Sequence, residues 1–391
     1  MPFYDKAFTI AGKKISLAAL IWFLLALVAI FVQLGKGAGS INNYFIFKGV
    51  FWHTVQQTHL YHNYPAEYFD SNHYGPFFSI IIAPFAVLPD MIGCFLWGLV
   101  NAVILFYAVR RLPLDNGSRN LILLIGAVEM MTAMHNMQFN PMLTSWILLT
   151  WILVKEEKDF WATLFIAAGI LTKLYGIVGL AFFLFSANRL RFVVSFIFWM
   201  LVLAMLPMII SSPAFVWQSY QDWYQSLVEK NDANTESVMQ GMSAMRVIKK
   251  IFRLPGLPDL YIIATAAIFY LLPLLRFKQY KQVCFQLSYL AFLLIGVVIF
   301  SSSAESPTFV IAMIGVGIWY VIQPGRKGWA LWLMLFAIVL TSLSTTDLFP
   351  KSIKVDYIRP YALKALPCLI TWLVLAYQLL IKKFDIAKCP A

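Results

Sequence analysis

The chain has 391 residues, of which 61% are hydrophobic and 12% are charged, and its formal net charge is +12. A soluble domain carries about a quarter charged residues, so this composition excludes an ordinary soluble protein. A basic soluble chain would suggest nucleic acid as a partner, but here Lys and Arg recur in short segments between apolar runs. That pattern excludes nucleic acid and indicates a protein whose partners include membrane lipids.

The first apolar run, Ile15 to Leu34, contains no charged residue and is long enough to cross a bilayer. A signal peptide would have a shorter core and a cleavage site of small residues, so we interpret the run as an anchored helix. Eleven more apolar runs predict an all-α polytopic protein of about 12 transmembrane helices, at residues 91–109, 120–134, 141–154, 160–172, 175–187, 192–210, 259–275, 283–300, 308–322, 328–344 and 364–381.

Positive charge alternates between the segments that join these runs. Every segment on one side carries at least two Lys or Arg, among them Lys13 and Lys14, Arg326 and Lys327, and Lys382 and Lys383. Cytoplasmic loops carry such an excess, so we predict a multi-pass protein of the plasma (inner) membrane with both termini cytoplasmic.

The other side then holds a first external loop, 35–90, and a second large one, 211–258. Neither is long enough for a separate soluble domain, so residues 1–391 are predicted to form one transmembrane domain. Within the first loop, Pro76 to Leu88 would be a helix of only about 20 Å, so we predict a juxtamembrane or re-entrant helix there. The short runs 160–172 and 175–187 predict a hairpin with Lys173 at its tip.

Several short motifs occur in order along residues 40–310. They are Asn43-Tyr44-Phe45-Ile46-Phe47, Leu60-Tyr61, Tyr74-Gly75-Pro76-Phe77-Phe78, Ala83-Pro84-Phe85, Leu88-Pro89, Trp97 with Asn101, Gln138-Phe139-Asn140, Ala168-Gly169 with Lys173-Leu174-Tyr175, and Ser306-Pro307. Together they resemble glycosyltransferase family 87, the polyprenyl-phosphate-mannose-dependent mannosyltransferases of the GT-C superfamily. The resemblance implies a GT-C-like bundle that moves a hexose, mannose in that family, from a polyprenyl-phosphate sugar donor to an extracytoplasmic lipid or glycan acceptor, with inversion and without a cofactor.

The chain departs from this family at one position. The family usually has an Asp, thought to be the base, shortly after the first span, and the matching residue here is Asn43, whose amide cannot accept a proton. Asp70 is our first candidate for the base and Glu67 the second. The alternative for Asp70 is that it caps the following turn. His59, His62 and His73 share the loop, but their spacing is not that of a metal site, and no metal is expected.

The leaving phosphate calls for cations. Lys173 follows an apolar run at a position matching the family's lysine, and we expect it to bind the donor phosphate, unless it merely extends to the membrane interface. Arg246, Lys249 and Lys250 are further phosphate-binding candidates. Their spacing, continued by Arg253, predicts one basic helix face, although anionic lipid headgroups would attract the same face.

The remaining candidates are polar residues near the predicted outer face. Asn43, His73, Tyr74, Gln138 and Asn140 are predicted to bind substrate. Glu305, a third catalytic candidate, either meets sugar hydroxyls or sits beside a helix N-terminus as a cap. Glu129 lies inside a predicted span and is expected to form a structural hydrogen bond.

A transporter or a flippase of a polar or lipid-linked solute is the rival hypothesis. Such proteins usually contain repeated halves, and the sequence shows no internal repeat. The candidate polar residues also gather on one predicted face, which favours a membrane enzyme.

Overall fold

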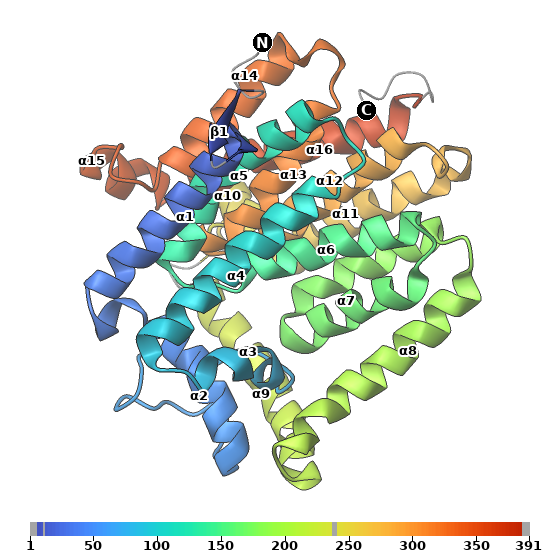
Figure 1. Ribbon diagram of the computed structural model, residues 1–391. Helices are drawn as coiled ribbons and strands as arrows, with labels where there is room; N and C mark the ends of the chain where they lie inside the picture. Colours follow the sequence, from blue (N-terminus) through green and yellow to red (C-terminus); the bar gives the residue numbers. More distant parts are fainter. Residues whose placement is uncertain (1–5, 11, 237–240, 385–391) are drawn as a thin grey trace. The chain divides into compact units, whose positions relative to one another are not determined.

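The computed structural model describes residues 6–10, 12–236 and 241–384, and 75% of the chain is helical. Its one sheet among these residues is an antiparallel hairpin of β1 (Ala7–Ile10) and β2 (Lys13–Ser16), in which Ala7 pairs with Ser16. This N-terminal hairpin precedes the first helix (Figure 1). The helical class expected from the apolar runs is therefore confirmed.

Backbone contacts divide the chain into two compact units. The first comprises Met1–Phe23, Leu112–Thr132 and Asn234–Ala391, and the second comprises Leu24–Arg111 and Ala133–Ala233. Three helices have residues in both units: α1 (Leu17–Gly35), α5 (Asn116–His135) and α9 (Pro213–Glu236). The single domain expected from the sequence stays a prediction.

The second unit holds most of the predicted site. Its further elements are η2 (Ala38–Ser40), α2 (Asn42–Gln56), α3 (Phe78–Ala86), α4 (Asp90–Arg110), α6 (Asn140–Lys155), α7 (Asp159–Thr172), η3 (Leu174–Phe185), α8 (Arg189–Met205) and η4 (Leu206–Ile209). Helix α6 packs on both α4 and α7, and α7 packs on α8. Fourteen of the residues of α6 are buried, so this helix forms the centre of the unit.

The predicted hairpin around Lys173 is present. Helix α7 ends at Thr172, Lys173 is extended, and η3 returns against α7. The two arms approach closely at Gly169 and Gly176, where a Cβ on Gly176 would lie 2.5 Å from the Gly169 backbone. Small residues permit this kind of backbone approach, so the glycines fix the hairpin geometry.

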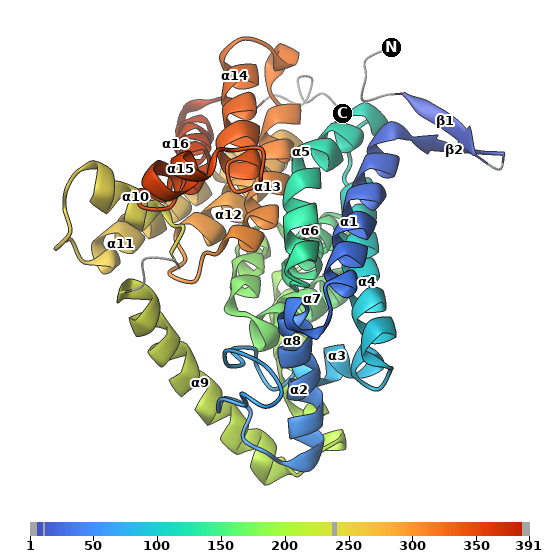
Figure 2. The ribbon, with the colours of Figure 1, turned by 90° about the vertical axis from the view of Figure 1, so that its left-hand side faces the viewer.

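Residues 35–90, the predicted first external loop, are more ordered than the sequence suggested. The predicted short helix is α3, whose nine residues include Pro84 and cover only about 14 Å. A second helix, α2, was not predicted, and it packs against α3 (Figure 2). Its buried residues include Tyr44, Phe47 and Phe51, but Asn, Lys and His interrupt them, so no continuous apolar run marked the helix.

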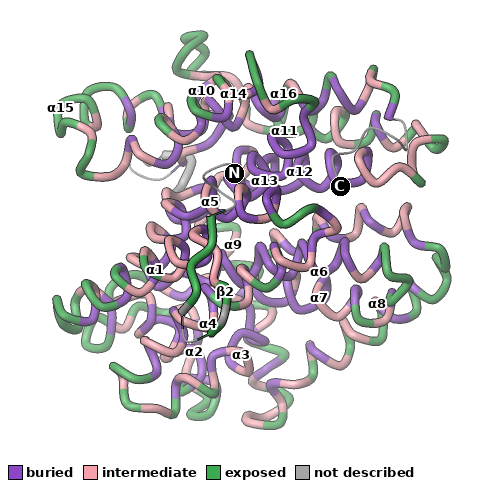
Figure 3. The backbone as a smooth tube through the Cα atoms, turned by 45° about the horizontal axis from the view of Figure 1, so that its top comes forward, coloured by how far each residue is buried: buried purple, intermediate pink, exposed green. Residues whose placement is uncertain are grey.

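The first unit contains the C-terminal helices. They are α10 (Ala244–Ile251), α11 (Asp259–Leu271), α12 (Val283–Ile299), α13 (Phe309–Val321), α14 (Trp329–Phe336), α15 (Lys351–Ile353) and α16 (Leu366–Ile381), with 3₁₀ segments η5 (Leu272–Leu275), η6 (Phe277–Gln279), η7 (Ser306–Thr308), η8 (Pro324–Arg326) and η11 (Leu363–Ala365), and π segments η9 (Ala337–Leu343) and η10 (Lys354–Ile358). Helix α12 packs along α13, every residue of which is buried (Figure 3). These two helices are the core of the unit.

Each of the twelve predicted spans coincides with a helix. Among the described residues, four helical segments are long and apolar enough to cross a membrane: Leu17–Gly35, Asp90–Arg110, Arg189–Ile209 and Leu363–Ile381. Six shorter apolar helices accompany them. The protein is thus a helical membrane protein, while the number of crossings stays a prediction.

Candidate active site

Lys173 lies at the turn between α7 and η3, in the second unit. Its ammonium donates a hydrogen bond to Asn140 Oδ1 over 2.9 Å and lies 5.7 Å from the centroid of the Tyr74 ring and 5.0 Å from that of Tyr175. The side-chain amide oxygen and the ring faces orient a cation without neutralising its charge. The structure therefore groups the predicted phosphate ligand with two predicted substrate ligands.

Tyr74 reaches this cluster because its neighbour is glycine. The Gly75 amide donates to the Thr172 carbonyl over 3.1 Å, and a Cβ on Gly75 would lie 2.1 Å from the Leu171 carbonyl oxygen. The loop therefore lies directly against the end of α7. The Tyr74 hydroxyl is left 3.4 Å from Gln138 Oε1, to which it donates a long hydrogen bond.

Three aromatic rings pack against the ring of Tyr74. Its ring lies 5.0 Å from Phe47, 4.6 Å from Phe78 and 5.9 Å from Phe139, measured between centroids. Phe47, Phe78 and Phe139 are each no more than 2% exposed. The contacts with Phe47 and Phe139 are edge-to-face, a geometry that aromatic pairs favour, so buried rings hold the Tyr74 side chain in place.

Trp97 and Asn101, noted in the sequence, hold the segment that carries Gln138 and Asn140. The indole nitrogen of Trp97 donates to the Met137 carbonyl over 2.9 Å, and Met137 has a positive φ of 47°. Asn101 Oδ1 accepts from the Met142 amide, an otherwise unpaired donor in the first turn of α6. Both residues are buried and act on the site through backbone positions.

His73 is fixed on three sides. Its Nδ1 lies 3.0 Å from Ser226 Oγ, its Nε2 lies 3.3 Å from Ser71 Oγ, and its carbonyl accepts from Trp223 Nε1. Burial is the largest cause of a lowered pKa of His73, the charges of Lys230 and Lys173 add to it and Asp70 opposes it, and together they bring the pKa to about 4. The imidazole is therefore neutral near pH 7.

Asp70 adopts a left-handed backbone conformation, with φ of 73°. One carboxylate oxygen accepts from the Ser71 amide over 2.8 Å and the other lies 4.0 Å from Lys230 Nζ. The side chain is 58% exposed, so the carboxylate is reachable from outside. This bond goes to the adjacent amide, whereas a capping side chain accepts from an amide two or three residues further on, so both the capping alternative and the catalytic role stay predictions.

Glu67 is engaged elsewhere in the loop. Its Oε2 lies 3.1 Å from Nε2 of His53, a residue of α2 that is 3% exposed. This contact joins the loop to α2. Asp70 has only a longer contact of 4.0 Å with a basic side chain, so its carboxylate is the more available of the two. His59, another loop residue, pairs with Asp222 of α9 over 3.2 Å and stacks on His62. The parts of the chain that the structure describes contain no group of three His, Cys, Asp or Glu suited to a metal.

Asn43 and its neighbour Asn42 are both used as hydrogen-bonding groups. Asn43 Nδ2 donates to the Asn136 carbonyl over 2.8 Å. Asn42 accepts from the Phe69 amide and donates to the Phe69 carbonyl, which fixes the residue before Asp70. Side chains that the sequence analysis missed, Asn42, Trp223, Ser226 and Lys230, thus position the predicted ones, and only long-range packing brings them there.

The basic candidates of the first unit lie on α10. Ser243 caps this helix by accepting from the Arg246 amide. The prediction that one helix face carries all four cations is wrong, because α10 ends at Ile251 and Arg253 is left-handed with φ of 55°. Pro255 comes two residues after Arg253, and helical geometry is disfavoured at Leu254, the residue before this proline.

The individual cations of α10 differ in their surroundings. Lys249 forms an ion pair with Asp259 over 2.6 Å. Burial lowers the pKa of Arg246, since desolvation disfavours its charged form. Lys250 follows Lys249 in the same short helix. The phosphate-binding role of Arg246, Lys249 and Lys250 stays a prediction.

Glu305 is the N-cap of η7. Its side chain accepts from the Thr308 amide, and Thr308 Oγ1 accepts from the Glu305 amide over 3.4 Å, which forms a capping box. This is the capping alternative described above. A role in binding sugar hydroxyls stays a prediction.

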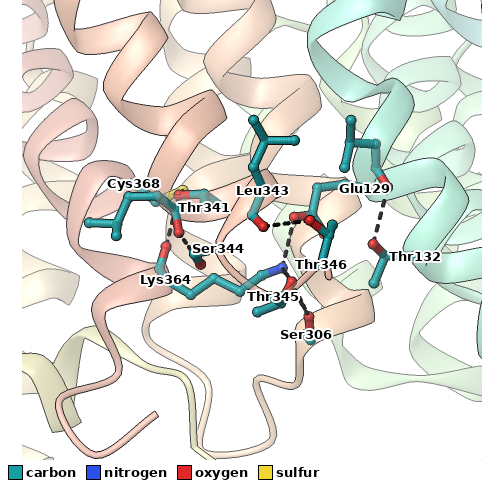
Figure 4. A network of polar contacts seen from close by, with 12 residues as sticks. Glu129, Thr132, Ser306, Thr341, Leu343, Ser344, Thr345, Thr346, Lys364 and Cys368 are labelled. Atoms are coloured by element: carbon teal, nitrogen blue, oxygen red, sulfur yellow. Dashed lines mark hydrogen bonds and ion pairs between the residues drawn. The ribbon is translucent and has the colours of Figure 1, made fainter. Parts of the chain in front are cut away.

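Glu129, which lies in a predicted span, has a buried partner of opposite charge. Its Oε1 lies 2.7 Å from Lys364 Nζ, and both side chains are fully buried (Figure 4). Lys364 also donates to Ser306 Oγ over 2.9 Å and to Thr345 Oγ1 over 3.3 Å. The predicted structural hydrogen bond is present, but the sequence did not reveal Lys364 as its donor.

Helices that are long and apolar enough to cross a membrane define a membrane protein, and the polar cluster around Lys173 and Asn140 is its candidate active site. Residues 72–302, well over half of the chain, match the sequence model of glycosyltransferase family 87, and the chain belongs to that family. No curated protein matches the sequence. The matched range contains His73, Tyr74, Gln138, Asn140 and Lys173, and it begins after Asp70.

Proposed function

We propose that this membrane glycosyltransferase moves a hexose, mannose by resemblance, from a polyprenyl-phosphate sugar to an extracytoplasmic lipid or glycan acceptor. The contact between Lys173 and Asn140, beside Tyr74, carries this proposal. A cation oriented by a neutral acceptor keeps its charge for a phosphate. A sugar linked to one phosphate develops less leaving-group charge than a nucleotide sugar, so a lysine can stabilise it without a metal.

The transfer is a single displacement that inverts the anomeric configuration. The acceptor oxygen forms a bond to the anomeric carbon while the bond from that carbon to the phosphate oxygen breaks. Asp70 takes the hydroxyl proton, and the phosphate leaves with the electron pair beside Lys173. Gln138, Asn140 and the Tyr74 hydroxyl offer hydrogen bonds to the sugar or the phosphate.

His73 has a supporting role in this proposal. Its imidazole is neutral, because its pKa is lowered to about 4, and it is already shared between Ser71 and Ser226. A neutral ring adds no charge to the site and holds the Asp70 to Tyr74 segment in place. Asn43, which donates to a carbonyl, is assigned a substrate-positioning role rather than proton transfer.

Family membership favours this reaction over the transporter hypothesis. The direct test is to incubate the purified, reconstituted chain with radiolabelled polyprenyl-phosphate mannose and a membrane-lipid extract as acceptor. Label should move to a new product with wild type and not with Lys173→Met. Transfer from a nucleotide sugar in the absence of any polyprenyl phosphate would contradict the proposed donor.

The orientation belongs to the same proposal. We expect cytoplasmic termini and an external loop 35–90, so single cysteines placed at Ser40 and Lys383 should react with an impermeant thiol reagent from opposite sides. Labelling of both from one side would contradict the twelve-span topology.

A further inference from the structure

A pocket of about 420 Å³ opens in the first unit, between the turn that precedes α14 and the end of α16. It is distinct from the Lys173 cluster, whose residues all belong to the second unit. The lining residues that bear on its chemistry are Gln323, Lys327, Trp329, Tyr377, Gln378 and Lys382. Two segments that are distant in the sequence, 323–330 and 377–382, therefore each contribute one lysine to the same pocket.

In the turn before α14, the side chains of Arg326 and Lys327 make different contacts. The Arg326 guanidinium turns inward, donates to Ser118 Oγ over 2.5 Å and lies 3.7 Å from Asp115. Lys327 is exposed and lines the pocket. Glycines at 325 and 328, with φ of 71° and 61°, permit this change of direction.

Among the described residues neither pocket lysine has an anionic partner, and the Lys382 ammonium lies 5.6 Å from the centroid of the Phe384 ring. Within residues 6–10, 12–236 and 241–384, no ion pair involves Lys327 or Lys382, and no carboxylate lines the pocket. Partial burial lowers the pKa of Lys382, because desolvation disfavours the ammonium. An anion bound beside it would offset that cost.

The floor and the rim of the pocket differ in polarity. Gln378 Nε2 donates to Gln323 Oε1 over 2.9 Å, and these side chains are only 9% and 3% exposed. Trp329 and Tyr377 are 58% and 62% exposed although they lie at the ends of apolar helices. Exposed aromatic rings at such positions are typical of the membrane interface.

We propose that this pocket binds the phosphate headgroup of an anionic membrane phospholipid. Lys327 and Lys382 would hold the phosphate, the buried glutamines would meet its ester or glycerol oxygens, and the acyl chains would run along the exposed rings. Basic pockets between transmembrane helices recognise lipid headgroups by this chemistry. Free phosphate would use the lysines and leave the aromatic rim without a role.

The charge pattern of the sequence adds an independent argument. Lys327 and Lys382 belong to segments predicted to face the cytoplasm, where anionic lipids attract Lys and Arg. The site would thus face the cytoplasm in the predicted topology. The proposal concerns lipid binding alone and does not depend on the sugar, the donor or the acceptor.

Native mass spectrometry of the full chain, titrated with phosphatidylglycerol or phosphatidylcholine, tests the site. Lys327→Gln/Lys382→Gln should bind phosphatidylglycerol about 25-fold more weakly, since each lysine contributes about fivefold, and should bind phosphatidylcholine as wild type does. The matched control is Lys281→Gln/Lys383→Gln, which removes two exposed lysines outside the pocket. This variant should bind phosphatidylglycerol as wild type does. Lys327→Arg/Lys382→Arg keeps the charge and should retain the lipid, which separates lost binding from lost folding.

Three results would overturn the proposal. Equal loss of phosphatidylglycerol in both glutamine pairs would assign it to general surface charge. Unchanged retention in the pocket pair would remove the site. Displacement of bound lipid by millimolar inorganic phosphate would assign the pocket to free phosphate instead.

Discussion

Glu129 and Lys364 form an ion pair of 2.7 Å in which neither side chain is exposed, although 235 residues separate them in the chain. Removing one partner from such a pair leaves a buried charge, which costs about 3–5 kcal/mol. The pair therefore joins α5 to the segment before α16 within the first unit. Ser306 and Thr345 complete the coordination of the ammonium (Figure 4).

We predict that Lys364→Met lowers the free energy of unfolding by about 3–5 kcal/mol. Glu129→Gln/Lys364→Met should recover most of that loss, since neither residue then carries a charge. Thermal unfolding of the purified variants in detergent measures both effects. A double variant as unstable as Lys364→Met would show that the carboxylate and the ammonium do not act as a pair.

Lys173→Met should reduce kcat/KM for the lipid-linked donor by roughly 10²–10³-fold, because the leaving phosphate loses its cation. Lys173→Arg should retain part of the activity. Asn140→Ala should cause a smaller loss, since the ammonium stays but loses the acceptor that orients it. Steady-state kinetics with purified donor gives these values, and unchanged donor kinetics in Lys173→Met would leave only a membrane-interface role.

Asp70→Asn keeps the shape of the side chain and removes its basicity, so turnover should fall by roughly 10²–10⁴-fold while donor binding stays. The matched control is Glu67→Gln, an equivalent change in the same loop at a carboxylate that pairs with His53. It should affect stability more than turnover. If Asp70→Asn is active and Glu305→Gln is dead, the base is Glu305.

The lowered pKa of His73 predicts a pH dependence of stability. A folded-state pKa of about 4, against an ordinary value of 6.5, means that the unfolded state binds the proton more tightly. Stability is then fully present above pH 6.5 and is lost as the pH falls from 6.5 towards 4. Melting temperatures across this window should fall less steeply for His73→Gln than for wild type.

The comparison with wild type is needed for a physical reason. His59 also has a pKa lowered by burial and by His62, so it contributes to the same window. Only the difference between the two proteins isolates His73. Identical slopes for wild type and His73→Gln would show that this imidazole is not buried in its neutral form.

Gly75→Ala should disturb the site more than its size suggests. The added Cβ would lie 2.1 Å from the Leu171 carbonyl oxygen, so the loop must move away from the end of α7. Overpacking of this kind costs about 1–3 kcal/mol, and turnover should fall with it. Gly39→Ala is the control, because a Cβ there meets nothing within 4 Å. Equal activity of both variants would contradict the fixed contact between Tyr74 and Lys173.

Local features could be predicted from the sequence. Long apolar runs indicated the helices, and the break after residue 172 indicated the hairpin with Lys173 at its turn. The short helix after Pro76 followed from its length alone. Motif order placed Tyr74, Gln138, Asn140 and Lys173 in one candidate site, and three contacts in the second unit join them.

The sequence by itself thus determined the membrane class, the helices and the chemical types at the site, since hydrophobicity and chain length act over neighbouring residues. Tertiary structure alone decided which side chains meet. Helix α2 exists through packing on α3, Ser226 and Trp223 reach His73 from α9, and Lys364 reaches Glu129 across 235 residues. Such pairings satisfy buried polar groups, and nothing in the local sequence records which distant residue will supply the partner.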